Sequence, residues 1–451
     1  MTKEYKVLLI AMSGVRVVNE KLLNTGLTLP GFVDRSKVIA SLPSLGLLTL
    51  AAHTPENWEV IYKEMDAYTE DDIVEILNIK PDIIAFSSLT ARIYETYKLA
   101  SRFRKERITI VLGGLHVSAL PDEAAQYADA VVQGEGEICW KELLTDYEHN
   151  SLKPLYSSLS NPHYVFDFKE AKVPKYELLD MAKYNRLTLQ TTRGCPLHCN
   201  FCAASRTIST YKKKPIKLIK KELDKIFEIW NQPFIVIELA DDNTFVDKKW
   251  SKKLLKLFAN YNMKWFTETD ISIAYDDELL ALLAKSNCLQ VLIGLESVNF
   301  NSVKGLDKGW KHKHFDNYSK AIDKIQSYGI TVNGCFVLGF DSDTKETFLE
   351  TEKFIKECNL SDVQITLLTP FPSTNLYHQL KSEGRLLPNY WNKCTLFDVA
   401  FIPKNFTIAE LENEFQNLMT SVYSDDLVAK RKMIFKQTLL NKKQAGHKLI
   451  S

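Results

Sequence analysis

The sequence predicts an α/β protein in three parts: an N-terminal doubly wound, Rossmann-like parallel sheet, a partial (β/α)6 TIM-like barrel, and a small helical C-terminal region. Two observations support this fold class. Short apolar strands alternate with helix-length segments along most of the chain, which is typical of parallel sheets. The alternation stops in a stretch with three prolines and then resumes. We therefore expect a first domain at 1–150, a linker at 151–184, a barrel at 185–400 and helices at 401–451.

The first domain is expected to alternate strand and helix strictly. In such a sheet the strands run parallel, and the loops after them gather at one edge, where ligands bind. The expected strands are Val7 to Met12, Trp58 to Tyr62, Asp82 to Phe86, Ile108 to Leu112 and Ala130 to Val132. The expected helices are Pro43 to His53, Glu70 to Ile79, Tyr94 to Arg104 and Pro121 to Tyr127.

Three loops at this edge have distinctive residues. Ser87-Ser88-Leu89-Thr90 follows the third strand with small hydroxyl side chains. Gly113-Gly114-Leu115-His116 follows the fourth, and Gly134-Glu135-Gly136-Glu137 follows the fifth. Glycines let a ligand approach the backbone closely. These loops are the candidate binding loops of the first domain.

The barrel is expected to contain six strand–helix units, with functional groups at the carboxyl ends of the strands. Its expected strands are Leu187 to Thr191, Phe234 to Leu239, Trp265 to Thr269, Gln290 to Gly294, Thr331 to Leu338 and Gln364 to Leu367. The expected helices are Pro215 to Ile229, Lys248 to Ala259, Asp276 to Lys285, His314 to Tyr328 and Thr344 to Glu357.

Three cysteines in a CxxxCxxC pattern lie just past the first barrel strand, where the chain reads TRGCPLHCNFC from Thr192. Three thiolates hold a cubane cluster and leave one iron open to a chelating molecule. A zinc site usually takes four ligands, and the nearby fourth candidate is His198. A CxxC redox pair would leave Cys195 idle. The pattern favours a [4Fe–4S] cluster on Cys195, Cys199 and Cys202.

The composition is that of an ordinary globular protein, with 45% hydrophobic and 25% charged residues in 451. The net charge of +1 gives no general field for nucleic acid or an anionic membrane. The apolar run Val7 to Met12 is too short for a signal peptide, and no apolar stretch has spanning length. We expect a cytoplasmic protein. The other five cysteines are scattered through the chain, which is typical of small residues buried in the core.

The cysteine motif, with Arg193 before it and Phe201 just before its last cysteine, resembles that of the radical S-adenosylmethionine (SAM) enzymes. The resemblance implies that the open iron binds SAM and that an electron from the cluster splits SAM into methionine and a 5'-deoxyadenosyl radical. Glu296, in Gly294-Leu295-Glu296-Ser297, looks like the family's residue for the SAM ammonium or ribose. Asp241 and Asp242 are candidate contacts of the same kind or structural loop charges, and Arg193 is expected to meet a carboxylate or the cluster's negative charge.

The three loops of the first domain together resemble the cobalamin-binding domain that precedes the radical SAM core in one large subgroup. The resemblance, which runs from about Val7 to Phe401, implies that the serine-rich and Gly-Gly loops enclose the nucleotide tail and the underside of the ring. The subgroup's DxHxxG motif, whose histidine ligates cobalt, is absent: Met65 to Glu70 reads MDAYTE. We expect cobalamin to bind without a protein histidine as lower ligand. His116 is a possible substitute, although such a loop histidine is more often a hydrogen-bonding residue.

The implied reaction is C-methylation of an unactivated carbon in a small-molecule, natural-product or lipid substrate, with electrons from a flavodoxin- or ferredoxin-type reductant. Two alternatives stay open: non-methylating radical chemistry such as cyclisation or ring rearrangement, and a non-catalytic corrinoid-binding or electron-transfer protein. The segment from Leu427 to Ser451 carries seven Lys or Arg among apolar residues. It is expected to be a helix with a solvated basic face over an apolar seam, or one in weak contact with anionic lipid.

Overall fold

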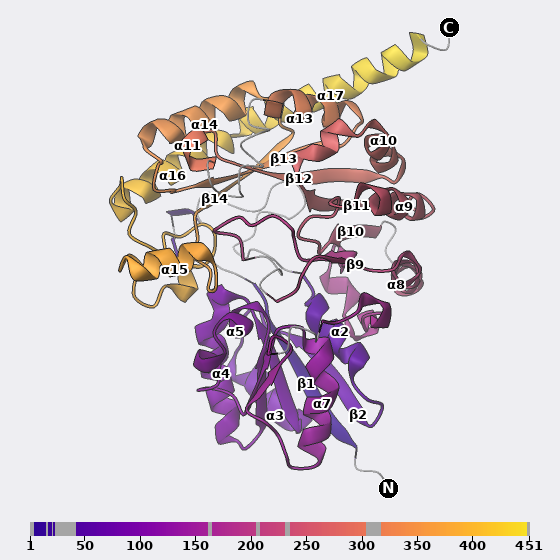
Figure 1. The fold of residues 1–451 in the computed structure, drawn as a ribbon, viewed down its shortest axis with the longest axis vertical. Helices are drawn as coiled ribbons and strands as arrows, with labels where there is room; N and C mark the ends of the chain where they lie inside the picture. The colour runs from indigo at the N-terminus through magenta and orange to yellow at the C-terminus, as the bar shows by residue number, and fades with distance from the viewer. Residues whose placement is uncertain are drawn as a thin grey trace.

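The computed structural model describes residues 4–14, 17–19, 21–22, 42–160, 165–203, 208–230, 235–303 and 317–448, with side chains described to 440. The chain forms two lobes, each built on a parallel sheet, with the N-terminal lobe at the bottom and the barrel at the top of Figure 1. Within the described residues no helix is both long and apolar enough to cross a membrane.

The N-terminal sheet has the strand order β2-β1-β3-β4-β5-β6, all parallel. This doubly wound order has its switch point between β1 and β3, where ligands of such sheets bind. The strands are β1 (Tyr5–Met12), β2 (Trp58–Glu64), β3 (Ile83–Ser88), β4 (Thr109–Gly113), β5 (Ala130–Gln133) and β6 (Leu155–Ser157). The helices are α2 (Leu45–His53), α3 (Glu70–Ile79), α4 (Ile93–Lys105), α5 (Leu115–Ala119), α6 (Pro121–Ala124) and α7 (Gly136–Glu148), with a 3-10 turn η1 (Thr90–Arg92).

Both faces of this sheet are covered, as a doubly wound fold requires. In β1 the side chains alternate: Val7 and Leu9 pack with α2 and α7, and Leu8 and Ile10 pack with α3 and α4. The alternation follows from the period of two in a strand. The sequence places the first five strands correctly to within a few residues, and it misses α5 and α7.

The sixth strand, β6, corrects the expected linker. It pairs with β5, and the Val131 amide donates to the Pro154 carbonyl at the entry to this pairing. Proline is tolerated there because β6 is an edge strand. A strand of three residues has too short a pattern to be recognised. The rest of the linker carries the short 3-10 turns η2 (Phe168–Glu170), η3 (Tyr176–Leu178) and η4 (Met181–Lys183).

The second sheet is six-stranded and open, with its strands in sequence order, as a partial barrel requires. Its strands are β7 (Leu187–Leu189), β10 (Ile235–Leu239), β11 (Met263–Thr269), β12 (Cys288–Glu296), β13 (Thr331–Leu338) and β14 (Asp362–Leu367). The helices are α8 (Ile216–Ile229), α9 (Lys248–Phe258), α10 (Asp277–Lys285), α11 (Phe300–Val303), α13 (Tyr318–Ser327) and α14 (Lys345–Glu357), with a 3-10 turn η6 (Ile271–Tyr275). All six expected strands and the five expected helices are present; residue 234 of one strand and residues 314–316 of one helix lie outside the described residues.

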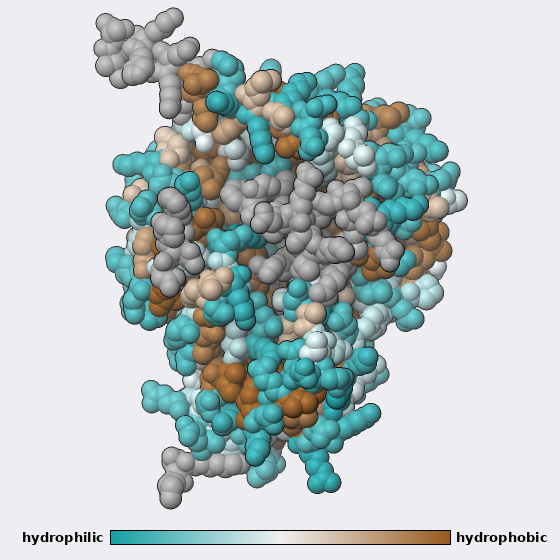
Figure 2. Space-filling model, turned by 180° about the vertical axis from the view of Figure 1, so that it is seen from behind, coloured by the Kyte–Doolittle hydropathy of each residue, from teal (hydrophilic) through white to brown (hydrophobic). Residues whose placement is uncertain are grey.

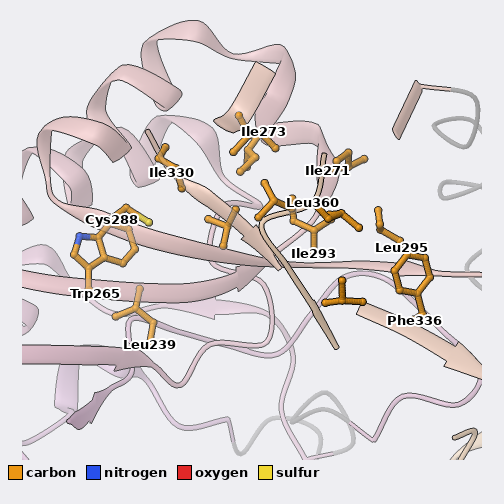
Figure 3. Close-up of a cluster of buried hydrophobic side chains, with 14 of the residues drawn as sticks. Leu239, Trp265, Ile271, Ile273, Cys288, Ile293, Leu295, Ile330, Phe336 and Leu360 are labelled. Atoms are coloured by element: carbon orange, nitrogen blue, oxygen red, sulfur yellow. The ribbon is translucent and has the colours of Figure 1, made fainter. Parts of the chain in front are cut away.

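The largest core lies between this sheet and its helices (Figure 3). It takes every second residue of each strand, such as Trp265 in β11 and Ile293 in β12. The strand residues between them are often polar, such as Glu238, Glu268 and Gln290. The barrel therefore presents its apolar side to the helices and its polar side chains to the other face.

The C-terminal region consists of α15 (Asn375–Ser382), a 3-10 turn η8 (Tyr390–Lys393), α16 (Ile408–Val422) and α17 (Asp425–Lys448), whose far end projects from the molecule in Figure 1. The first half of α17 packs on the barrel. Arg431 is buried and donates to the Val422 carbonyl, and Leu439 lies 3.5 Å from the position of a Cβ on Gly329. This supports the solvated face over a packed seam. The surface seen from behind is mainly hydrophilic, with separate apolar patches (Figure 2).

Asp398 joins the C-terminal region to the first domain. Its buried carboxylate accepts hydrogen bonds from the backbone amides of Val18 and Asn19, at 2.9 and 2.8 Å, and from the hydroxyl of Thr395. Val18 and Asn19 follow β1, so this carboxylate fixes the loop at the switch point of the first sheet.

We expect Asp398→Ala to lower the free energy of unfolding by about 1–3 kcal/mol, because it leaves buried donors without an acceptor. Urea denaturation measures the loss. The matched control is Asp425→Ala, which removes an exposed acid at the start of α17. Equal stability of the two variants would contradict the role given to Asp398.

Candidate active site between the two sheets

The cysteine motif lies in a hairpin that follows β7. Two short antiparallel strands, β8 (Thr192–Arg193) and β9 (Lys212–Lys213), close the base of this hairpin. The cysteine loop, residues 194–211, connects them, and its residues 204–207 lie outside the described part of the chain. The hairpin therefore begins at the carboxyl end of the first barrel strand, where barrels carry their functional groups.

The three cysteines are held as a set in this loop. Cys199 is buried, Cys195 and Cys202 are half-buried, and none of the three forms a disulfide. The Cys202 amide donates to the Cys199 carbonyl at 3.3 Å, which forms a turn between them. In the described residues no three His, Cys, Asp or Glu side chains converge on one metal ion. A cubane takes its thiolates on separate irons, so its ligands do not need to converge, and a three-thiol loop with partial exposure fits it.

Gly194, beside the first cysteine, has a conformation that only glycine adopts easily. Its φ is +80°, and a Cβ there would lie 2.9 Å from backbone atoms of Thr210 and Tyr211. Its amide donates to Asp242 at 2.8 Å. The two sides of the hairpin therefore approach each other at Gly194 more closely than any side chain permits.

Asp241 has the hydrogen bonds of a structural carboxylate, which is one of the two alternatives that the sequence left open. It is 3% exposed and accepts from the amides of Thr191 and Thr192 at 2.7 and 2.9 Å. The hydroxyls of Thr191 and Thr244 also donate to it. Burial raises the pKa of Asp241, and these hydrogen bonds oppose that change. The oxygens of Asp241 are engaged in joining β7 and β8 to the end of β10.

Arg193 meets carboxylates, which is one of the two alternatives that the sequence left open, and these carboxylates belong to the first domain. Its guanidinium donates to Glu135 at 2.8 Å and to Glu137 at 2.7 Å. Lys212, opposite Arg193 in the hairpin, also pairs with Glu135. Burial alone would raise the pKa of Glu137, but Arg193 holds it below its ordinary value. Glu135, expected in a cobalamin loop, therefore has its side chain turned to the hairpin.

Phe201 packs on protein in the structure. Its ring lies edge-on to Phe340, with 5.9 Å between ring centroids, against an apolar cluster that includes Val337 and Leu368. The Asn200 carbonyl accepts from the Leu376 amide at 3.0 Å. These contacts attach the far side of the cysteine loop to β13 and α15.

Glu296 occupies a strained position at the end of β12. Its φ is +68°, an uncommon value for a residue with a side chain, and the pairing of β12 with β13 shifts register just before it. The side chain is 8% exposed. Strain of this kind collects at binding sites.

Glu268, which the sequence offers as a candidate contact at the end of the third barrel strand, lies at the end of β11 near other carboxylates. Its side chain has accessible surface but is surrounded by protein. Desolvation by the protein around it and the charges of Glu238, Asp242 and Glu296 raise its pKa to about 7. The strand ends of the barrel thus form an acidic region that suits a cationic ligand.

The candidate loops of the first domain lie together at the carboxyl edge of its sheet. Gly114 has φ +102°, and a Cβ there would lie 3.1 Å from the Ser87 hydroxyl, so these two loops approach closely. Ser88 is tied to Leu89 and Thr96 by hydrogen bonds of 3.0 and 2.8 Å. Leu89 and Leu115 are 45% and 44% exposed. Two exposed leucines on tight, glycine-containing loops fit a large, flat apolar ligand such as a corrin ring.

His116 is a buried hydrogen-bonding residue, as the alternative to cobalt ligation expected. One ring nitrogen lies 3.3 Å from the Thr90 hydroxyl, and the other lies 3.3 Å from Glu123. The ring packs edge-on against Trp391 of η8. Both nitrogens therefore have partners within the protein.

Gly134 and Gly136 serve the packing of the third loop. Gly134 has φ +87°, and a Cβ on it would collide with the Ser158 hydroxyl at 2.2 Å. A Cβ on Gly136 would lie 3.1 Å from Leu50 of α2. Gly113, at the end of β4, has ordinary contacts at 3.7 Å.

Arg92 is a residue of this edge that the sequence analysis missed. It is 2% exposed and donates to the carbonyls of Ser13, Gly14 and Asp66, which follow β1 and β2. A bidentate pair with Glu95 orients it. Any residue offers a backbone carbonyl, so the partners of Arg92 leave no pattern in the sequence. The one sequence signal for its role is its position next to the serine-rich loop.

Family models match three parts of the chain. The B12 binding domain matches residues 33–144, the Radical SAM superfamily matches 189–355, and a domain of unknown function (DUF4070) matches 374–449. The Bacteriochlorophyllide d C-8(2)-methyltransferase of Chlorobaculum tepidum is 30% identical over 325 residues, which is 69% of this chain and 71% of that protein. The chain belongs to the cobalamin-dependent radical SAM family.

Other relatives of this radical SAM enzyme include the Bacteriochlorophyllide d C-12(1)-methyltransferase of the same organism, 26% identical over 401 residues (87% of this chain, 84% of the relative). An Anaerobic magnesium-protoporphyrin IX monomethyl ester cyclase of Rubrivivax gelatinosus is 24% identical over 345 residues (69% and 61%). The fold matches the radical SAM methyltransferase TsrM from Kitasatospora setae, solved with cobalamin and a [4Fe-4S] cluster, with a TM-score of 0.64, 16% identity and coverage of 86% and 76%. The family's cofactors are a [4Fe–4S] cluster, SAM and cobalamin.

We expect Gly194→Ala to reduce iron incorporation after anaerobic reconstitution. The added Cβ meets backbone on the opposite side of the hairpin, and its φ is unfavourable for alanine by about 1–2 kcal/mol. Iron and sulfide analysis gives the cluster content. Gly384→Ala is the matched control, because Gly384 has φ +68° but no atom within 4 Å of its Cβ position. Equal losses of iron in both variants would show that the conformation, and not the hairpin contact, is responsible.

Glu268 gives the cofactor-free chain a defined pH dependence. Its pKa is about 7 in the folded chain against an ordinary value of 4.5. Between these values the unfolded chain releases a proton that the folded chain retains, so the stability contribution of Glu268 falls as the pH rises from about 4.5 to about 7. Below 4.5 both states are protonated, and the carboxyl group has no effect.

Glu268→Gln should therefore raise the melting temperature more at about pH 8 than at about pH 4.5. Differential scanning fluorimetry at the two pH values measures the difference. Glu350→Gln, on the exposed side of α14, is the control and should shift neither value. A pH-independent effect of Glu268→Gln would contradict the shifted titration.

Proposed function

We propose that this enzyme methylates an unactivated carbon of a small-molecule, natural-product or lipid substrate. The observation that carries the proposal is the position of the cysteine hairpin. Through Arg193 it contacts the loop that follows β5, at the edge of the first sheet where ligands of doubly wound folds bind. The two cofactor sites therefore border one interface, and a substrate between them is within reach of both.

The cluster would be held by Cys195, Cys199 and Cys202. Ser87, Ser88, Leu89, Thr90, Gly113, Gly114 and Leu115, together with Gly134 and Gly136, would shape the cobalamin site. Glu296 would receive the ammonium or ribose of SAM, because a carboxylate held in place by a strained backbone accepts such donors well. When bound, the cluster and cobalamin supply radical generation and methyl transfer. The chain's own residues hold the reactants in place and exclude water.

The net reaction balances as follows. One SAM gives its methyl group to the substrate carbon, and one takes the substrate hydrogen as 5'-deoxyadenosine. The products are the methylated substrate, S-adenosylhomocysteine, methionine and 5'-deoxyadenosine. The two SAM molecules carry two sulfonium charges and the products carry none, so the reaction consumes two electrons. An external flavodoxin- or ferredoxin-type reductant supplies them.

Cyclisation without methyl transfer is the second candidate function, because the Rubrivivax gelatinosus relative is a cyclase by name. The two candidates give different products from the same cofactors. Methylation uses SAM both as methyl donor and as radical source, so it forms S-adenosylhomocysteine and 5'-deoxyadenosine. Cyclisation forms 5'-deoxyadenosine without stoichiometric S-adenosylhomocysteine.

We expect anaerobic incubation of the reconstituted chain with SAM, methylcobalamin or hydroxocobalamin, and a reductant to form both 5'-deoxyadenosine and S-adenosylhomocysteine, measured by mass spectrometry. Cys199→Ala should abolish 5'-deoxyadenosine, because the cluster loses one of its three thiolates. Cys139→Ala, which changes a buried thiol of α7, is the matched control and should retain it. Formation of 5'-deoxyadenosine by the Cys199 variant would refute the cluster assignment.

A further inference from the structure

Arg193 forms a charged connection between the two lobes. It lies in β8, two residues before Cys195, and its side chain is 12% exposed. Its partners Glu135 and Glu137 lie at the start of α7, and their side chains are 3% and 7% exposed. The contacts join residues 58 and 56 positions apart in the chain. A planar guanidinium that reaches two carboxylates fixes their relative orientation as well as their distance.

Neighbouring groups make this connection rigid. The Arg193 guanidinium lies 4.9 Å from the centre of the Phe168 ring, and Lys212 lies 5.2 Å from it. Lys212 also donates to the Phe166 carbonyl at 2.8 Å. Gln190, in the turn before β8, accepts from Arg193 at 3.0 Å. With these partners, a movement of the β5–α7 loop displaces the base of the cysteine hairpin.

We propose that Arg193 and Glu137 form a positioning pair that couples the two cofactor sites, so that a cluster in the cysteine loop strengthens cobalamin binding at the first sheet, and the reverse. The inference rests on the proposed assignment of these two sites. Its physical basis is linkage: once one ligand has ordered its loop, the connected loop is already ordered for the second ligand. The coupling acts through the Arg193–Glu137 pair, so neither residue needs to touch a cofactor.

The test is a titration of the full-length chain with hydroxocobalamin under anaerobic conditions, followed by tryptophan fluorescence. The dissociation constant is measured with the cluster reconstituted and with the cluster absent, and the ratio of the two constants is the coupling factor. We expect a factor of about five or more for the wild type. Glu137→Gln should bring the factor close to one. An EPR spectrum of the reduced cluster should respond to hydroxocobalamin in the wild type and not in this variant.

Glu222→Gln is the matched control. Glu222 is as buried as Glu135 and pairs with Lys214 at 2.7 Å, but both partners belong to the barrel lobe. It should keep the coupling factor of the wild type. Arg193→Lys serves if Glu137→Gln folds poorly: it keeps a positive charge between the carboxylates, but one ammonium cannot bind both in the geometry of the fork, so the factor should fall.

A coupling factor of one in the wild type would overturn the inference. An unchanged coupling factor in both Glu137→Gln and Arg193→Lys would also overturn it. An equal fall of the coupling factor in Glu222→Gln would overturn it too, because it would assign the effect to a general loss of structure. Failure of the wild type to bind a cluster or hydroxocobalamin at all is a different result, because it would overturn the proposed function and the inference with it.

Discussion

The site depends on one constraint: the fold has to hold the base of the loop that carries the three thiols in a fixed place. Without such support, the whole loss of conformational entropy on ordering the loop would oppose cluster binding. Here carboxylates that are buried or half-buried order the chain at several points before any cluster binds. Asp241 joins the ends of β7 and β10, Asp242 holds the Gly194 amide, and Glu135 and Glu137 hold the arginine before the motif. The hairpin base is therefore set by the fold, and only the loop above it is left to the ligand.

The same carboxylates give the interface its electrostatic character. Those that stabilise the hairpin have hydrogen-bond donors or cations of the protein as partners. Glu268 is different, because desolvation and the charges of neighbouring acids raise its pKa. A cationic ligand at the strand ends would relieve this repulsion and favour the ionised form. The carboxylates that hold the cysteine hairpin are therefore paired with donors of the protein. The acidic strand ends around Glu268 can instead pair with a sulfonium compound.

Most of the fold could be predicted from the sequence, because parallel strands and their helices leave a strong alternating pattern. The cysteine motif was equally readable, since its three ligands are local. What the sequence did not reveal are the roles that depend on distant partners. Arg193 lies next to a cluster motif, yet its partners come from another lobe. Asp241 follows a strand as a ligand would, yet the amides of Thr191 and Thr192, which lie after the neighbouring strand β7, donate to it. The edge strand β6 was missed because three residues carry no period.

The docking of the lobes explains why both cofactor sites border one interface. Loops after four strands of the first sheet contact the second lobe, each in a different way. The loop after β1 binds Asp398, η1 after β3 packs on η8, His116 after β4 packs on Trp391, and Glu135 after β5 binds Arg193. The carboxyl edge of the first sheet therefore contacts the C-terminal region after β1, β3 and β4, and the cysteine hairpin of the barrel after β5. A doubly wound sheet binds ligands at that edge, and a barrel carries its chemistry at strand ends. Because buried contacts join those two edges, the proposed substrate site between them depends on how the two lobes dock.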